Sequence, residues 1–213
     1  MARSLLTLFA ITDEQAMWRV QMEDDAQAFA QLVSRWEEPI QRLCTRMLDD
    51  SHRAEDLTQE TFARVFAKRK DYQPNGKFST FLWRIALNLC YDELRRLKRR
   101  QETALDLDSG EAMAGLEVLT AAGPGPDEQL QDEEQGQLVR QALQQLAEPY
   151  RSVIVLRHYE NLKFREIADV LEIPEGTVKS RMAEALTQLE KLLRHVMEEP
   201  GKNSKPNREC LMI

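Results

Sequence analysis

The 213-residue sequence is poor in the residues that make turns and large aromatic clusters. It contains 8 glycines and 8 prolines, and aromatic residues make up 7% of the chain. β-Sandwiches and barrels need a turn every 8 to 12 residues or so, which means that this scarcity argues against them and favours helices. The length suits one large domain or two small ones.

Cysteine is also scarce, and the chemistry that depends on clustered side chains is not indicated. Cys44, Cys90 and Cys210 lie far apart and form no C-x-x-C pair, so they predict neither a metal site nor a disulfide framework. Cys44 and Cys90 fall on apolar helix positions and are expected to fill a core. The three histidines are dispersed, and no glycine-rich phosphate loop or nucleophile–base pair is recognisable. The sequence therefore argues against an enzyme and predicts no cofactor.

Long apolar runs are missing as well. No run approaches the ~20 apolar residues that span a bilayer, so no membrane insertion is expected. The apolar stretch near the N-terminus is short, and Thr12, Asp13 and Glu14 follow it in place of a small-residue cleavage site. We therefore expect a cytoplasmic protein without a signal peptide.

Positive charge is absent from one segment. The formal net charge is −7, but residues 101–139 contain ten acidic residues and no lysine or arginine, so the rest of the chain sums to −7 + 10 = +3. Residues 123–126 read Gly-Pro-Gly-Pro, and this composition disfavours a packed core. The segment predicts an acidic linker. The flanking parts are mildly basic, so the negative total does not by itself argue against a nucleic-acid partner.

Helical periodicity dominates both sides of this linker. Helices are predicted from Thr12, from residue 25 to 47 with a kink or interruption at Pro39, from 54 to 70 with Phe62 and Phe66 facing inward, and from 79 to 100. Four more are predicted over residues 137–147, after Pro149, over 164–171 and over 175–196. The predicted fold is all-α: two small helical domains joined by a flexible acidic linker, the second a helix-turn-helix domain. The predicted boundaries are an extension (1–11), a first domain (12–100), the linker (101–130), a second domain (131–196) and a disordered tail (197–213).

The helix predicted over residues 79–100 divides into two faces. One is an apolar arc that includes Leu82, Leu89 and Leu94. The other, called the polar stripe below, consists of Arg84, Asn88, Tyr91, Arg95, Lys98 and Arg99. Cations bind phosphate, an amide reads base edges and an aromatic ring stacks on an unpaired base. The stripe therefore favours nucleic-acid binding, although a solvated charged face would have the same composition.

Residues 162–182 are typical of a helix-turn-helix. Ile167, Ala168 and Leu171 are expected to pack inward, Ile173 to fill the turn, and Val178 and Met182 to anchor the second helix. The first turns of that helix carry Thr177, Lys179, Ser180 and Arg181, where such motifs contact the major groove. An αα-hairpin of a small helical domain is the alternative interpretation.

The predicted helix-turn-helix domain carries no net charge. Residues 163–194 contain six cations and six acidic residues, so counterion release would contribute little and binding to DNA alone should be weak. Such a module fits better as one arm of a reader that is tethered at a second site.

Several runs, in order, resemble extracytoplasmic-function sigma factors of bacterial RNA polymerase. DDAQAF at residues 24–29 and AEDLTQETF at 54–62 are similar to the first conserved domain of that family. FSTFLWRIALN at 78–88, with Asp92 and Arg95-Arg96, is similar to the part that melts the −10 promoter element. LAEPYR at 146–151 and GTVKSR at 176–181 resemble the second domain, which reads the −35 element. The resemblance covers residues 12–193.

The resemblance implies partners and residue roles. It implies binding to core RNA polymerase, through the β′ clamp helices and the β flap, to promoter DNA and in many members to an anti-sigma factor. Core-polymerase binding falls to Asp56, Gln59 and Glu60. Contacts to the −10 element fall to Trp83, Arg84, Asn88, Tyr91, Arg95 and Arg99, with Asn88 near the pocket for a flipped base. Contacts to the −35 element fall to Thr177, Lys179, Ser180, Arg181 and Glu184.

The chain departs from the family pattern after Arg181. The family often has basic or aromatic residues there, but this chain has Glu184, which would either accept from a cytosine amino group or repel phosphate. Two other functions remain open at this stage. An autonomous helix-turn-helix regulator would use only the last helices, and a helical adaptor would have lost DNA binding; neither explains two nucleic-acid-facing elements on either side of a linker.

Overall fold

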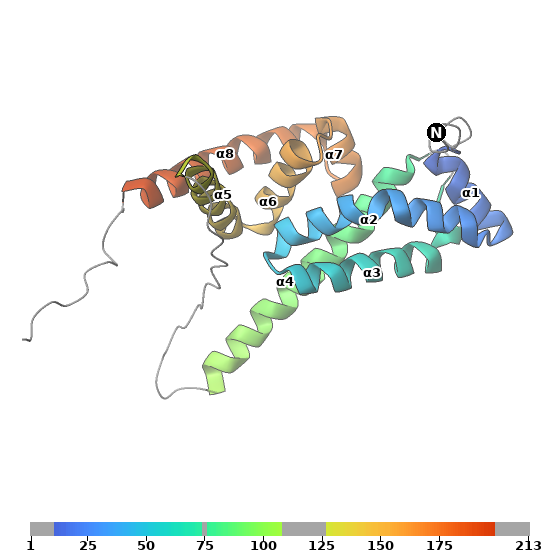
Figure 1. The fold of residues 1–213 in the computed structure, drawn as a ribbon, viewed down its shortest axis with the longest axis horizontal. Helices are drawn as coiled ribbons and strands as arrows, with labels where there is room; N and C mark the ends of the chain where they lie inside the picture. Colours follow the sequence, from blue (N-terminus) through green and yellow to red (C-terminus); the bar gives the residue numbers. More distant parts are fainter. Residues whose placement is uncertain (1–10, 74–75, 108–126, 199–213) are drawn as a thin grey trace, which may run out of the picture.

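The computed structural model describes residues 11–73, 76–107 and 127–198, and every regular element in these ranges is helical. This confirms the predicted all-α class. The elements, in chain order (Figure 1), are α1 (Asp13–Glu23), α2 (Ala26–Leu48), α3 (Ser51–Ala67), η2 (Arg69–Asp71), α4 (Phe78–Leu107), α5 (Asp127–Gln145), α6 (Glu148–Ile154), η3 (Val155–Tyr159, a π-helical turn), α7 (Phe164–Leu171) and α8 (Glu175–Glu198).

The helices on both sides of the predicted linker are longer than expected. Helix α4 continues to Leu107 and α5 begins at Asp127, so both extend into residues 101–130. The end of α4 projects away from the other helices (Figure 1), so local helix propensity and not packing accounts for its extra turns. The prediction ended the helix earlier because it considered only whether this segment could form a packed core. The centre of the predicted linker, the end of the tail with Cys210, and residues 1–10 lie outside the described residues.

Pro39 does not interrupt α2. The helix runs from Ala26 to Leu48 with Pro39 in its interior, which makes the predicted interruption wrong. The proline ring removes one hydrogen bond, but packing holds the helix on both sides of it. Leu32 precedes it, Ile40 and Leu43 follow it, and all three are fully buried.

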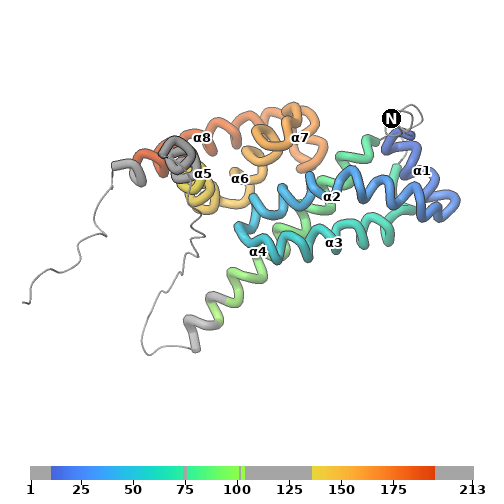
Figure 2. Tube along the Cα trace, in the orientation of Figure 1, coloured from blue at the N-terminus to red at the C-terminus, as the bar shows by residue number. Residues whose placement is uncertain are grey.

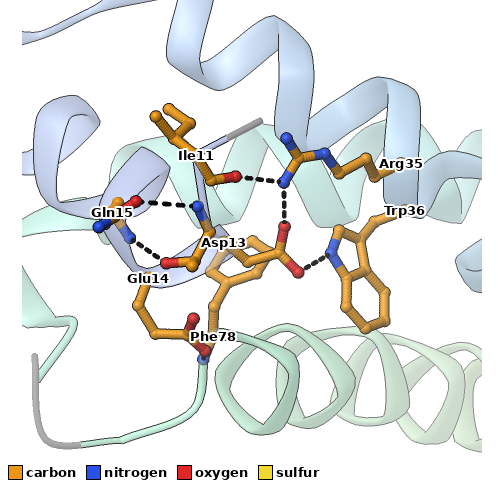
Figure 3. Close-up of polar contacts among 8 residues, drawn as sticks. Ile11, Asp13, Glu14, Gln15, Arg35, Trp36 and Phe78 are labelled. Atoms are coloured by element: carbon orange, nitrogen blue, oxygen red, sulfur yellow. Dashed lines mark hydrogen bonds and ion pairs between the residues drawn. The ribbon is translucent and has the colours of Figure 1, made fainter. Parts of the chain in front are cut away.

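Polar contacts at the start of α1 connect three helices of the first domain. Thr12 caps α1 and forms a capping box with Gln15. The Asp13 carboxylate accepts hydrogen bonds from Arg35 at 2.8 Å and from the indole N–H of Trp36 at 2.9 Å, as Figure 3 shows. Glu14 accepts a hydrogen bond from the backbone N–H of Phe78 at 3.3 Å (Figure 3). These contacts tie α1 to α2 and to the first residue of α4, and so fix where α4 starts.

The buried cysteines and phenylalanines test the predicted core. Cys44 of α2 and Cys90 of α4 are both fully buried, with their sulfur atoms 3.7 Å apart, which confirms the core-filling role. Phe62 is buried, but Phe66 is 37% exposed, so its predicted inward position is wrong. Phe66 lies one residue before the end of α3, and its ring packs between the ring of Phe29, with centroids 5.3 Å apart, and the guanidinium of Arg69, 4.3 Å from the ring centroid.

The two domains pack against each other. Helices α6–α8 lie over α2 and the first half of α4 (Figures 1 and 2), and the buried apolar residues of both domains form one continuous cluster. Arg151 of α6 donates to the carbonyl of Met47 at the end of α2, and Gln144 of α5 donates to the carbonyl of Arg46 at 2.9 Å. The domain packing is a feature that the sequence did not predict.

Two further expectations concern the described residues alone. Within residues 11–73, 76–107 and 127–198, none of the helices combines the length and the apolar character needed to cross a membrane. In the same ranges, His, Cys, Asp and Glu side chains form no group of three or more that could hold a metal ion.

Candidate nucleic-acid interface

Helix α4 presents the polar stripe on the side away from the first-domain core. Leu82, Ala86 and Cys90 on the opposite arc are fully buried, as the periodicity predicted. Along the stripe, Asn88, Arg95 and Arg99 are exposed, and Arg84 and Tyr91 are half-buried. Arg95 makes an ion pair of 3.4 Å with Asp92 on the same helix. The predicted −10 residues therefore share one face, apart from Trp83.

Trp83 lies in the core instead. It is 3% exposed, and its ring packs edge-on against Trp36 with the centroids 5.6 Å apart. Trp83 was predicted to contact DNA because it lies within the 78–88 motif. Its direction around the helix differs from that of Arg84 by about 100°, so it does not share the face of the polar stripe. The buried ring is therefore not available to stack on a base.

Two cavities meet at Asn88. The larger, about 980 Å³, lies between the start of α4, residues 68–73 and 76–77, and α7. The smaller, about 300 Å³, lies between α3 and α4 and also contains Tyr91 and Arg95. Asn88 lines both cavities and is exposed, so its amide can donate to and accept from a group that enters either one.

The smaller cavity adds two basic residues that the sequence analysis missed. Arg64 and Lys68 line it together with Asn88 and Arg95. Arg64 is also paired with Glu60 at 2.8 Å. The two lie four residues apart at the end of α3, and this i, i+4 spacing of cations was the signal that could have identified them.

The second domain covers part of the stripe. Arg84 makes an ion pair of 2.9 Å with Glu172 and donates to the backbone carbonyl of Asp169 at 2.7 Å. Burial raises the pKa of Tyr91, and hydrogen bonding to Ser152 of α6 and the charge of Arg181 of α8 oppose this. In this arrangement, two stripe residues face the chain's own second domain.

The residues predicted to bind core polymerase form a separate surface. Asp56, Gln59 and Glu60 are all exposed on α3. They follow i, i+3 and i+4 spacing, so they share one side of the helix. This surface is acidic, whereas the polar stripe is basic.

The helix-turn-helix forms as the sequence predicts. Helix α7 ends at Leu171, and Glu172 adopts φ 55° as its cap. Val178 and Met182 anchor α8, being 0% and 6% exposed. Residues Ala168, Leu171 and Ile173 are partly buried and pack against the core.

The predicted −35 residues gather on the first turns of α8. Lys179, Ser180 and Glu184 are exposed, whereas Thr177 and Arg181 are half-buried. Lys179 is paired with Glu175 at 2.7 Å, and the Glu184 carboxylate accepts from Gln188 at 2.8 Å. Both partners lie on α8 itself, so none of these exposed groups is held by the first domain.

Comparison with known proteins gives two family matches. Residues 32–100 match the model of sigma-70 region 2, and residues 136–189 match that of sigma-70 region 4. The chain is 36% identical over 170 residues to the ECF RNA polymerase sigma factor SigW of Bacillus subtilis, covering 80% of this chain and 91% of that protein. It is 31% identical over 188 residues to the RNA polymerase sigma-H factor of Pseudomonas aeruginosa, covering 88% of this chain and 96% of that protein.

Solved structures share the fold. A complex of CnrH with the cytosolic domain of CnrY matches with a TM-score of 0.63 and 22% identity, covering 86% of this chain and 97% of the other. The sigma factor RpoE from Bartonella quintana, solved with the anti-sigma factor NepR, matches with a TM-score of 0.59 and 23% identity, covering 79% and 98%.

Proposed function

The chain belongs to the extracytoplasmic-function RNA polymerase sigma factors of the sigma-70 family, and from this we propose that it directs core polymerase to promoters. It binds core polymerase, recognises the −35 and −10 elements and promotes melting of the DNA. The observation that supports this proposal is that two polar surfaces, the polar stripe of α4 and the first turns of α8, lie on separate domains of one chain. The chain would act by binding and distorting DNA, without covalent chemistry.

We assign the melting of the −10 element to α4. Extruding a base from the duplex costs a few kcal/mol, so a pocket that pairs with the base edge favours the melted state. Asn88 lines a cavity of about 300 Å³ whose other residues include Tyr91, Arg95, Arg64 and Lys68. The amide would read the base and the cations would hold the strand backbone, with Arg84 and Arg99 extending that contact along the helix.

The −35 contact falls to the start of α8. Lys179, Ser180 and Arg181 would meet phosphates and base edges in the major groove, with Thr177 beside them. Glu184 lies one turn further along and would accept from a cytosine amino group. Because residues 163–194 carry six cations and six acidic residues, this contact is weak alone and depends on the tether that polymerase supplies.

Polymerase binding falls to the acidic side of α3. Asp56, Gln59 and Glu60 are exposed together and would face the β′ clamp helices, with the second domain reaching the β flap. Both domains match sigma-factor models, whereas an autonomous regulator would need only the second; the comparisons therefore do not favour that alternative.

An anti-sigma factor is a further proposed partner. The RpoE protein of Bartonella quintana, which shares the fold, was solved with its anti-sigma factor NepR. A protein partner of this kind would act by covering the surfaces assigned above to polymerase and DNA.

Two variants separate the proposed roles. Asn88→Ala removes the base-reading amide, so we expect impaired promoter opening, measured by permanganate reactivity of unpaired thymines, with polymerase affinity retained. Asp56→Lys with Glu60→Lys reverses the charge of the α3 surface, so we expect loss of binding to core polymerase. As a control, Glu190→Lys on α8 changes charge away from both surfaces and should leave both measurements unchanged. Equal effects of the first two variants in both assays would contradict the separate roles.

A further inference from the structure

The outer side of α1 carries two large apolar side chains that face away from the core. Ala16, Met17 and Val20 bury the inner side of the helix. Trp18 and Met22 lie four residues apart on the opposite side, and they are 47% and 65% exposed. Large apolar side chains that gather on a surface mark a place where something else packs. We call Trp18 and Met22 the outer pair of α1.

Within the described residues, the packing of α1 leaves the outer pair uncovered. The helix contacts α2, α4 and η2, and it lies at the opposite end of the molecule from α5 (Figures 1 and 2). Glu14 accepts a hydrogen bond from the backbone N–H of Phe78. Gln21 donates to the carbonyl of Tyr72 at 3.0 Å. These bonds fix the orientation of the helix, so the outer pair cannot turn inward to join the core.

An apolar segment immediately precedes α1. Residues 1–10 lie outside the described residues, and their sequence contains four large apolar residues: Leu5, Leu6, Leu8 and Phe9. A run of this kind favours a segment that packs against another surface. The segment meets the helix at Ile11, whose carbonyl accepts a hydrogen bond from Arg35 at 2.9 Å (Figure 3). This bond fixes the point from which the segment leaves α1.

The segment is long enough to reach both members of the outer pair. At about 1.5 Å per residue, Met22 lies roughly 15 Å beyond Thr12 along α1. About five extended residues cover the same distance, at roughly 3.3 Å each. Residues 4–10 therefore suffice to turn back and to run beside the helix, past Trp18, as far as Met22.

The charge of α1 favours this segment over a lipid surface as the occupant. Residues 12–24 contain four acidic residues and one arginine, which gives a net charge of −4 + 1 = −3. An anionic bilayer would repel this helix. The only charged side chain among residues 1–10 is that of Arg3. When the segment runs back along α1, Arg3 comes near the acidic end of the helix at Glu23 and Asp24.

We propose that residues 4–10 fold back along α1 and pack their apolar side chains on Trp18 and Met22. Helix α1 has 11 residues, a length that is marginal without packing, so the docked segment stabilises it. Because Glu14 of this helix binds the backbone of Phe78, the segment also supports the start of α4. The inference goes beyond the sigma-factor role and does not depend on it.

The docked state depends on a small number of apolar contacts. Ordering the segment has an entropic cost, which these contacts must exceed. A leucine that becomes half-buried on docking favours the docked state by a factor of about 4 to 10. Replacing two such leucines should therefore lower the ratio of docked to free segments by about 16- to 100-fold.

The test measures how accessible Trp18 is in the full chain. The 3 tryptophans are replaced by 5-fluorotryptophan, and the fluorine NMR resonance that is missing from Trp18→Phe is assigned to Trp18. A soluble, uncharged gadolinium chelate broadens the resonances of accessible side chains. Trp83 is 3% exposed, so its resonance is the internal reference for a folded core.

Two matched variants decide the outcome. Leu5→Ser with Leu8→Ser should increase the broadening of the Trp18 resonance and speed deuterium exchange of the α1 amides. Leu186→Ser, at a leucine that is 45% exposed on α8, should change neither measurement. Equal broadening of the Trp18 resonance in the unmodified chain and in the double variant overturns the inference.

The same label distinguishes other occupants of the outer pair. Protection of Trp18 that disappears when the unmodified chain is diluted would assign the outer pair to a second copy. Retention on vesicles of phosphatidylethanolamine and phosphatidylglycerol, with Trp18 accessible in the free chain, would assign it to a bilayer. Either result overturns the proposal, whereas protection that is independent of concentration and is lost in the double variant supports it. These samples contain neither polymerase nor DNA, so failure here leaves the sigma-factor role standing.

Discussion

Arg151 shows how one buried side chain joins the two domains. It is 6% exposed, and its guanidinium donates to the carbonyls of Met47, Gln144 and Leu146 and to the Gln144 side chain. Met47 lies in the last turn of α2, where carbonyls have no partner within the helix. Burial lowers the pKa of Arg151, and the charges of Glu148 and Asp49 oppose this. One cation therefore satisfies acceptors from both domains.

Removing that cation should lower the stability of the folded chain. Arg151→Met keeps much of the side-chain volume but leaves buried carbonyls without donors, so we expect the free energy of unfolding to fall by about 3 kcal/mol. Urea denaturation followed by circular dichroism measures it. Arg194→Met, at an exposed ion pair, should change it by less than about 1 kcal/mol. Similar losses for both variants would contradict the role of Arg151.

Tyr72 gives the first domain a dependence on alkaline pH. Burial, reinforced by the charges of Glu14 and Asp13, raises the pKa of Tyr72 to about 12, and its hydroxyl donates to the Gly76 carbonyl at 2.8 Å. Its contribution is therefore complete below pH 10 and is lost as the pH rises from about 10 to 12. Thermal unfolding across this range should show a flatter loss for Tyr72→Phe than for the unmodified chain. Parallel curves would contradict the assignment.

At the scale of elements, periodicity predicted most of what the structure contains. The anchoring of α8 by Val178 and Met182 followed from apolar spacing, as did the burial of Cys44 and Cys90. Periodicity failed where an element ends or where packing overrides a local preference. Phe66 is exposed because α3 stops one residue after it, and α2 passes through Pro39 because core contacts hold both sides.

Pro39 should therefore limit the stability of α2. Replacing it with alanine restores the hydrogen bond that residue 39 can donate to the Arg35 carbonyl and removes the clash of the ring with the preceding turn. We expect Pro39→Ala to raise the free energy of unfolding by at least about 1 kcal/mol, measured by urea denaturation. Ser34→Ala, exposed on the same helix, controls for helix propensity and should have a smaller effect. A loss of stability in Pro39→Ala would show that the ring's packing outweighs the missing bond.

At the scale of the whole molecule, the sequence predicted the two domains but not their contact. The ion pairs of Lys77 with Glu166 and of Arg84 with Glu172 join residues nearly 90 positions apart, and such pairs leave no periodic signal. The residues proposed to bind DNA were found from composition and resemblance. The structure then showed which of them are exposed: Asn88, Arg95, Arg99, Lys179, Ser180 and Glu184. The ion pair of Arg84 with Glu172 could be seen only with both domains in place.

The domain contact also accounts for part of the acidic charge of the second domain. The acidic residues that cancel its positive charge include Glu166, Asp169 and Glu172, which face α4 and not the start of α8. Binding to one polymerase would bring the two weak DNA contacts onto one assembly, where they reinforce each other.

The most direct test of the sigma-factor account is run-off transcription with purified chain and bacterial core polymerase on a promoter library, with core polymerase alone as the control. The account predicts promoter-specific transcripts that require the chain, and sequencing of their templates would reveal the −35 and −10 elements. A folded chain that neither binds core polymerase nor yields any transcript would contradict it.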